Sequence, residues 1–423
     1  MAIKSLRLDS IMLRLIVALA AIFCLVAAYY AARWCFGRTL AEQAQTKEAA
    51  ELATNLAPSD PQGHFRLAAF NERTFLAEDL PKALRGYEEA VARAPHDHRL
   101  WLALGKARER SGDAPGAEKS LRRAAELAPN YAEVHWTLGN QLLRQGNDEE
   151  AFVEIRRAVE QDKNYAAQAV TTAWQIFDGD ITQIRRKIGD SIAIKAGLAP
   201  FLARQNRFDE ALEFWNSVPE AEMSGAYKTY GDEIFAKLTE KKEFKKALAV
   251  YSQLNKSENE RFAADQVYNG DFERAVKSAG AAPFDWQIPA GQQPQIVLDK
   301  SQKRGGNQSL VLLFNSQTGE GFRPAAQTVV VASGKSYEFE AFYRAELKTS
   351  ATVQWEIVDA ADGKILATTA AAEPNAAGWL PLTASFIVPQ TSQAVVIRLA
   401  RAACKQSLCP IAGKIWFDDL SLK

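Results

Sequence analysis

Sequence motifs of known enzyme classes are absent from this chain of 423 residues. It contains no zinc-protease, nucleophile-elbow, phosphate-loop or dinucleotide-binding pattern. A charge excess is absent too, because 51 basic side chains balance 51 acidic ones, whereas binding to nucleic acid needs clustered positive charge. We therefore expect a protein that is not an enzyme and has no nucleic-acid partner. Glycosidase-type carboxylate pairs, whose members lie far apart in a sequence, leave a glycan-processing enzyme open as an alternative.

Cysteine is scarce, with four residues in the whole chain. Cys404 and Cys409 lie close together near the end, with no histidine or second cysteine pair nearby, so a metal site is not expected there. In an oxidising compartment such a pair forms a disulfide that closes a small loop. We predict this disulfide, and it agrees with a location outside the cytoplasm.

An uninterrupted apolar run from Leu15 to Ala32 is long enough to cross a bilayer as a helix. Arg14 and Arg33 bracket the run, and the basic residues before it favour a cytoplasmic N-terminus with the remainder outside. The run exceeds the usual apolar core of a signal peptide, and no clear cleavage site follows. We expect an uncleaved anchor in the bacterial inner membrane, with a cleaved signal peptide as the alternative.

A pattern of small and large apolar residues recurs with a period of about 34 residues. The copy in residues 98–131 contains Trp101, Leu104, Gly105, Ala117, Leu121, Ala124 and Pro129. Small residues allow two helices to approach closely, while the large ones fill the space between them. The pattern resembles the tetratricopeptide repeat, a helix–turn–helix unit. It implies an α-helical solenoid over residues 38–264, because single hairpins cannot bury their own apolar face.

The resemblance to tetratricopeptide repeats implies a groove for partner proteins. In that family the inward side chains of the first helix of each unit bind extended peptides. The corresponding candidates here are Lys106, Arg110, Trp136, Asn140 and Arg144. Their cationic and amide groups are of the kind that holds the carboxylate of a chain terminus. An ordinary solvated helix face is the alternative for each of them.

From about residue 265 onward, apolar and polar residues alternate with a period of two. Tyr337 and Phe339 fall on one side of such a run, and Phe342 falls on the other. Runs of this type, separated by Gly, Pro and Asn, predict an antiparallel β-sandwich over residues 265–423. The expected fold class is therefore multidomain α + β: a transmembrane helix in residues 1–37, the solenoid, and a jelly-roll sandwich.

A sugar site needs an aromatic platform for the pyranose ring and planar polar groups for its hydroxyls. The strand face opposite the predicted core aromatics supplies both kinds of side chain. The candidates for glycan binding are Phe342, Arg344, Gln354, Glu340 and Arg398. Cross-strand ion pairs on a wet face, with no ligand, are the alternative for the charged ones.

Short motifs in a fixed order mark this β region. They are Asn269-Gly-Asp-Phe-Glu, Phe284-Asp-Trp, Gly378-Trp and Trp416-Phe-Asp-Asp. The order resembles the carbohydrate-binding modules of the galactose-binding-like jelly-roll superfamily over nearly all of residues 266–423. The resemblance implies a structural calcium ion on Glu273, Asp418 and Asp419, with solvated strand ends as the alternative, and core positions for Trp286 and Trp379. We expect no other cofactor.

These patterns together suggest a single-pass scaffold that binds partner proteins outside the cytoplasm. The sandwich would contact a glycan, in cell-surface polysaccharide assembly or export. A pure protein–protein adaptor, whose sandwich does not bind sugar, is the main alternative.

Overall fold

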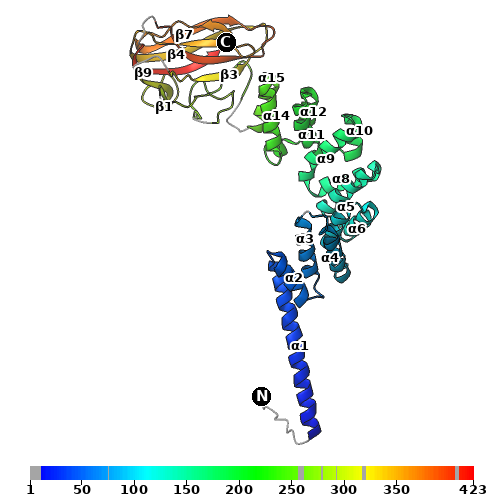
Figure 1. Cartoon of the computed structure of the whole chain (residues 1–423). Helices are drawn as coiled ribbons and strands as arrows, with labels where there is room; N and C mark the ends of the chain where they lie inside the picture. The colour runs from blue at the N-terminus through cyan, green and yellow to red at the C-terminus, as the bar shows by residue number, and fades with distance from the viewer. Residues whose placement is uncertain are drawn as a thin grey trace, which may run out of the picture. The chain divides into compact units, whose positions relative to one another are not determined.

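The computed structural model describes residues 11–423 except residues 75, 256–261, 278–279, 292, 317–320 and 405–408. The chain divides into two compact units, residues 1–194 and 195–423. Helices make up the described part of the first unit, and the second combines further helices with two β-sheets (Figure 1). This is the multidomain α + β architecture that the sequence predicts.

Helix α1 (Ile11–Gln43) has an exposed apolar part and a packed end. By length and composition it is able to cross a membrane, and its most apolar window is not buried in the protein. Its last turns pack on α2 (Lys47–Leu56) and bury Gly37 and Ala41. A Cβ atom on Gly37 would lie 2.7 Å from the Cβ of Ala57, so the contact requires glycine. The apolar helix therefore continues into the solenoid without a linker.

Pairs of helices build the rest of the first unit. The pairs are α3 (Pro61–Arg73) with α4 (Leu80–Arg93), α5 (His98–Arg110) with α6 (Ala114–Leu127), α7 (Ala132–Arg144) with α8 (Asp148–Gln161), and α9 (Ala166–Ile176) with α10 (Ile181–Ile188). A Cβ on Gly105 would come within 2.7 Å of Leu121 Cγ, and one on Gly139 would come within 2.8 Å of Ile155 Cγ1. The small residues of the repeat thus lie where two helices touch, as predicted.

A ring N–H recurs at the start of these pairs and closes the preceding loop. Trp101 Nε1 donates to the carbonyl of Pro95, six residues earlier, at 2.9 Å. The ring Nε2 of His135 lies 2.8 Å from the carbonyl of Pro129, again six residues earlier. The repeat therefore uses this position for a polar ring contact as well as for packing.

The helices of the second unit follow the less regular part of the repeat pattern. They are α11 (Ile192–Arg204, which begins in the first unit), α12 (Phe208–Asn216), α13 (Glu220–Met223), α14 (Lys228–Glu240) and α15 (Phe244–Leu254). Gly231 on α14 again marks a close approach, since a Cβ there would lie 2.5 Å from Leu254 Cδ2 and 2.7 Å from Trp215. The same packing rule thus extends through the degenerate repeats.

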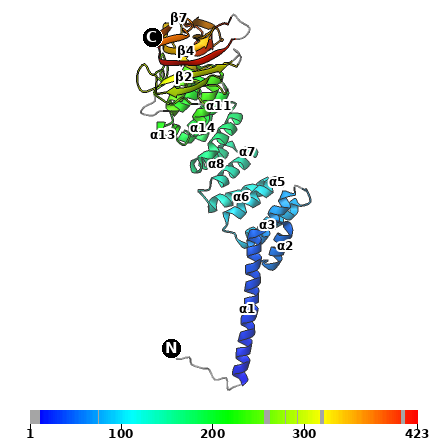
Figure 2. The same cartoon turned by 90° about the vertical axis from the view of Figure 1, so that its left-hand side faces the viewer.

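The β region is a sandwich of two antiparallel sheets (Figures 1 and 2). The five-stranded sheet has the order β1 (Gln295–Asp299), β2 (Ser309–Ser316), β9 (Ile411–Leu422), β4 (Ser336–Thr349), β7 (Asn375–Ile387). The four-stranded sheet has the order β3 (Ala326–Val330), β8 (Ala394–Arg401), β5 (Val353–Asp359), β6 (Ile365–Thr368). Consecutive strands often lie in different sheets, so strands that are adjacent in the sequence need not share a surface.

Aromatic residues from both sheets fill the space between them. Trp355 on β5 is fully buried, and its ring lies 5.9 Å from Phe339 of β4 and 5.2 Å from Phe417 of β9. Trp286, from the segment before β1, packs on the same indole at 6.0 Å. The predicted register of Tyr337 and Phe339 is confirmed, because both are at most 3% exposed.

The last helical hairpin packs against the sandwich within the second unit. The hydroxyl of Tyr251 on α15 donates to Oδ2 of the buried Asp285 at 3.0 Å. The rings of Tyr251 and Phe284 lie 5.7 Å apart, and α15 contacts β3. Because a buried carboxylate needs such partners, this contact ties the hairpin to the sandwich.

Candidate functional site

The solenoid places its groove candidates on α5 and α7. Each of the three cations there meets a carboxylate from a neighbouring helix pair. The ion pairs are Lys106–Glu133 at 2.5 Å, Arg144–Glu109 at 2.6 Å, and Arg110–Glu72. These cations are therefore neutralised within the protein and do not form an open clamp for a carboxylate.

The two uncharged groove candidates differ from each other. Asn140 Nδ2 donates to the carbonyl of Trp136, one turn earlier on the same helix, at 2.8 Å. The half-buried ring of Trp136 packs against Tyr165 at a centroid distance of 5.2 Å. The candidate positions thus carry an aromatic pair, Trp136 with Tyr165, beside compensated charges.

His135 is a buried polar residue of the solenoid that is not among the candidate site residues predicted from the sequence. It is 3% exposed, and Nδ1 lies 2.5 Å from Glu154 Oε2 while Nε2 faces the carbonyl of Pro129. Both ring nitrogens lie within hydrogen-bond distance of an oxygen, an arrangement that the doubly protonated ring satisfies with two N–H donors. The hydrogen bond to Glu154 raises the pKa of His135 above its usual value. Its signal in the sequence is position, one period after Trp101.

We predict that this histidine makes the solenoid less stable in alkaline solution. A folded-state pKa above the unfolded one gives stability that is complete below the unfolded pKa, near 6.5, and is lost as pH rises through the folded pKa. The stability advantage of the wild type over His135→Gln should fall by on the order of 1 kcal/mol across that range. Urea titrations followed by circular dichroism at several pH values measure it, and a constant difference would contradict the prediction.

The glycan candidates do not share a surface. Glu340, Phe342 and Arg344 point outward from β4 in the five-stranded sheet, whereas Gln354 and Arg398 belong to β5 and β8 in the four-stranded sheet. The expectation of one face is therefore wrong. Alternation separates inside from outside along each strand but does not say which sheet the strand joins. On its own sheet, Arg398 is paired with Glu356 at 2.7 Å.

A loop between β1 and β2 covers the ring of Phe342. The guanidinium of Arg304 lies 3.5 Å from the ring centroid and is also paired with Asp419. Arg344 donates to Gln302 Oε1 at 2.8 Å, on the same loop. The stacking face that a pyranose would need is occupied by a cation–π contact.

Trp379 lies at the rim of this loop and not in the core. Its side chain is half-buried, and Nε1 donates to the carbonyl of Lys303 at 3.1 Å. The expected core position is wrong for Trp379 but confirmed for Trp286, which is 3% exposed. Trp379 lies on β7, an edge strand of its sheet, which has a neighbouring strand on one side only.

The calcium candidates hold this loop through its N–H groups. Glu273 accepts from the amides of Asn307 and Gln308 at 2.6 and 3.1 Å, and these bonds lower the pKa of its carboxyl. Asp418 is 1% exposed and accepts from the amide of Arg304 at 2.8 Å, while burial raises the pKa of its carboxyl.

The carboxylates that bind this loop do not assemble around a cation. No three His, Cys, Asp or Glu side chains gather as metal ligands in the described part of the chain. The oxygens of Glu273 and Asp418 are taken by N–H donors, and Asp419 is taken by Arg304. The residues present therefore do not fit a calcium ion, and we derive no role for one.

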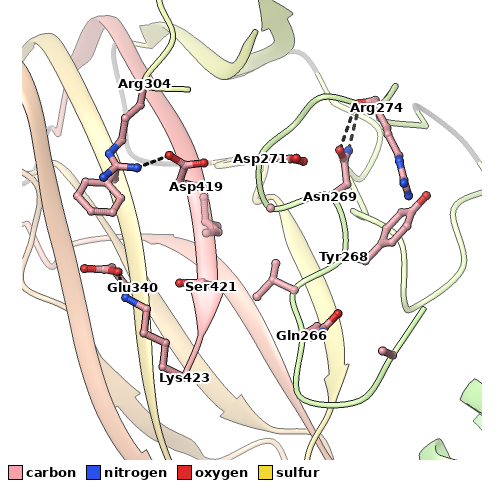
Figure 3. A pocket seen from close by; sticks show the side chains of 15 residues that line it. Gln266, Tyr268, Asn269, Asp271, Arg274, Arg304, Glu340, Asp419, Ser421 and Lys423 are labelled. Carbon is pink, nitrogen blue, oxygen red and sulfur yellow. Dashed lines mark hydrogen bonds and ion pairs between the residues drawn. The ribbon is translucent and has the colours of Figure 1, made fainter. Parts of the chain in front are cut away.

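A pocket of about 800 Å³ opens beside the covered ring. One wall is the outer side of β4 and β9, with Glu340, Asp419 and Lys423; the other is the loop of residues 263–274, with Tyr268 and Asp271 (Figure 3). Lys423 is paired with Glu340, as Arg304 is with Asp419. Apart from Glu340 and Phe342, and Asp419 as a calcium candidate, the pocket lining is not foreseen from the sequence, because its walls lie far apart in the chain.

Strain marks the strand that forms the pocket floor. Asp419 has a positive φ of 50°, and the pairing of β4 with β9 shifts by a residue between Glu340 and Phe342. Such bulges turn side chains away from regular alternation and are common next to binding sites. Here the bulge directs Asp418 and Asp419 toward the covering loop.

The predicted disulfide is present between Cys404 and Cys409, with the Cα atoms 6.2 Å apart. Cys409 is buried, and its carbonyl accepts from Arg401 at 3.1 Å. Neither cysteine is among the residues that line the pocket described above.

The sequence matches the family model of the tetratricopeptide repeat at residues 77–132 and 102–166. The chain thus contains tetratricopeptide repeats. No curated protein matches it as a relative.

Several solved structures are similar to parts of the chain. A carbohydrate-binding module of family CBM4 matches with 16% identity and a TM-score of 0.28, over 37% of this chain and 98% of that one. MamA matches with 13% identity and a TM-score of 0.28, over 47% and 89%. YrrB, described as a TPR protein with an unusual peptide-binding site, matches with 16% identity and a TM-score of 0.27, over 49% and 92%.

Proposed function

We propose that this protein is a non-catalytic scaffold, anchored in the bacterial inner membrane, whose repeats bind partner proteins outside the cytoplasm. Its sandwich contacts a glycan, and the assembly serves cell-surface polysaccharide assembly or export. The observation that carries the proposal is the run of tetratricopeptide repeats, since stacked helix pairs of this kind form extended surfaces for binding. The pathway rests on the pairing of such repeats with a sandwich that resembles sugar-binding modules.

The packing of α1 supports an anchor over a cleaved signal peptide. Gly37 and Ala41 lie in the same helix as the apolar run, and they are buried against the first helices of the solenoid. Cleavage after Ala32 would cut a continuous helix a few residues before this contact. The packed turns would then lie at the start of a shortened helix, where helix ends fray.

We expect the orientation to be testable with reporters. Alkaline phosphatase fused after Lys423 should be active in a bacterial host, because that enzyme folds only outside the cytoplasm, and a cytoplasmic reporter at the same place should be silent. A band of full length, with its N-terminus intact, would support the anchor. Activity from the cytoplasmic reporter alone would refute the orientation, and an N-terminus just after Ala32 would refute the anchor.

We expect Trp136 to contact a partner protein. Its half-buried ring, paired with Tyr165, is apolar, whereas the charged groove candidates are already neutralised by ion pairs. A photo-crosslinking amino acid placed at Trp136 should give discrete adducts with protein in intact cells. The same amino acid at Lys119, exposed on α6, is the matched control and should give none. Adducts at both positions, or at neither, would contradict a partner in this groove.

A pure adaptor is the second candidate function. The observation that favours it is the contact of Arg304 with Phe342, which occupies the ring that sugar stacking would use. Both candidates share the solenoid as the protein-binding part. They differ in whether the sandwich binds a saccharide.

A further inference from the structure

The pocket beside Phe342 is chemically mixed and electrically balanced. The three cations that line it are Arg274, Arg304 and Lys423, and the three anions are Asp271, Glu340 and Asp419. Two cation–anion pairs are made within the β4–β9 wall itself. A charged ligand would gain little from such a lining. A ligand rich in hydroxyl groups, which both donate and accept hydrogen bonds, fits it well.

The loop wall of this pocket is connected to the last helical hairpin by stacked rings. Tyr268, which lines the pocket, stacks on Phe262 at 4.1 Å. Phe262 meets Tyr251 of α15 edge-to-face at 4.8 Å, and Tyr251 packs on Phe235 of α14 at 5.1 Å. Arg274 also lies over the Tyr268 ring, at 5.4 Å.

The same loop is also bound to the sandwich, which fixes the width of the pocket. Gln327 on β3 is 1% exposed and bonds both the N–H and the carbonyl of Tyr268, at 3.0 and 2.9 Å. The amide of Leu420 donates to the carbonyl of Gly270 at 2.9 Å. A Cβ on Gly270 would lie 2.1 Å from the Leu420 carbonyl oxygen, so glycine is required at this contact.

We propose that this pocket is a composite saccharide site, with one wall from the sandwich and the other, carrying Tyr268, positioned by the last helical hairpin through Phe262. The ligand is uncharged and rich in hydroxyls, and it bonds the polar groups of the two walls, because cation–π contacts cover the rings of both Phe342 and Tyr268. The inference rests on the proposed glycan contact and adds its place and its dependence on the solenoid.

Binding and hairpin packing are then linked in both directions. A ligand that holds the loop of residues 263–274 in place stabilises the contact of Phe262 with Tyr251. Conversely, a hairpin that packs firmly presents a preformed wall, so less ordering accompanies binding. A protein partner on α14 or α15 would thereby change the affinity of the sandwich for its ligand.

The test is affinity electrophoresis of the full-length protein in mild detergent. Gels contain dextran, xylan, mannan or a soluble β-glucan as neutral polymers, or alginate as an anionic one. We expect a neutral polymer to retard the wild type. Tyr268→Ala should weaken that retardation about tenfold, because the loop wall loses its stacked ring contact with Phe262. Phe262→Leu, which leaves the pocket lining intact, should weaken it several-fold. Tyr230→Ala, on α14 but outside the ring chain, is the control and should behave as the wild type.

Each of the other outcomes contradicts a defined part of the proposal. Retardation by alginate alone would refute an uncharged ligand. Equal retardation of the wild type, Tyr268→Ala and Phe262→Leu by a neutral polymer would refute the composite site while leaving the glycan contact intact. No retardation of the wild type in any gel would refute the glycan contact itself and favour the adaptor. Near-ultraviolet circular dichroism of each variant shows whether the sandwich core has remained folded.

Discussion

Trp355→Ala should unfold the sandwich or leave it marginally stable. The indole is fully buried between the sheets and touches Trp286, Phe339 and Phe417. Its removal loses the buried apolar area and leaves a cavity that the surrounding sheets, held by their backbone hydrogen bonds, cannot close. Truncations of this size typically cost about 3–5 kcal/mol, which is a large share of the stability of a domain.

The matched control for this variant is Phe342→Ala on the outer side of β4. That change removes a cation–π contact with Arg304, worth about 0.5–2 kcal/mol, and no part of the core between the sheets. Urea unfolding, followed by the near-ultraviolet signal of the buried aromatics, compares the two variants with the wild type. A sandwich that tolerates Trp355→Ala but not Phe342→Ala would invert the register described above.

Ala117→Leu should destabilise the solenoid by about 1–3 kcal/mol, the usual cost of overpacking. Ala117 on α6 is fully buried where α5 and α6 touch, and its carbonyl oxygen would lie 3.4 Å from a Cβ on Gly105. Three additional carbon atoms cannot fit there without moving one helix. Because each helix pair is stabilised by its contacts with the adjacent pairs, disturbing the α5–α6 pair should also destabilise the pairs next to it.

Lys119→Leu supplies the control for Ala117→Leu, since it adds an apolar side chain to an exposed position of the same helix. Thermal unfolding monitored by far-ultraviolet circular dichroism should show a lower midpoint for Ala117→Leu alone. Unchanged stability of Ala117→Leu would mean that this residue does not face the partner helix.

Local sequence patterns predict most of the helices and strands of the fold. The spacing of Gly105, Ala117 and Leu121 predicts a helical hairpin because close approach and filling are properties of one repeat and its immediate neighbour. Alternation at Tyr337 and Phe339 predicts a strand with one buried side, because the pleat has a period of two. The apolar run before Arg33 predicts a helix able to span a membrane from its length alone.

Partners from distant parts of the chain were beyond such patterns. The cations Lys106, Arg110 and Arg144 looked available because the carboxylates that neutralise them lie in other helices. Likewise, no residue near Phe342 in the sequence indicates that Arg304 covers its ring. Ion pairs and ring contacts of this type depend on which surfaces the fold brings together.

Periodicity and side-chain size along the chain specify which segments form helices and strands and which side of each is apolar. The three-dimensional structure alone assigns β4 and β5 to opposite sheets, which separates Arg344 from Gln354. Only it placed Tyr268 across a pocket from Glu340, with Phe262 and Tyr251 behind the wall. The physical reason is that periodicity reports how a residue lies relative to its own backbone. Sheet order and loop packing are set by the summed burial and hydrogen bonding of the whole unit.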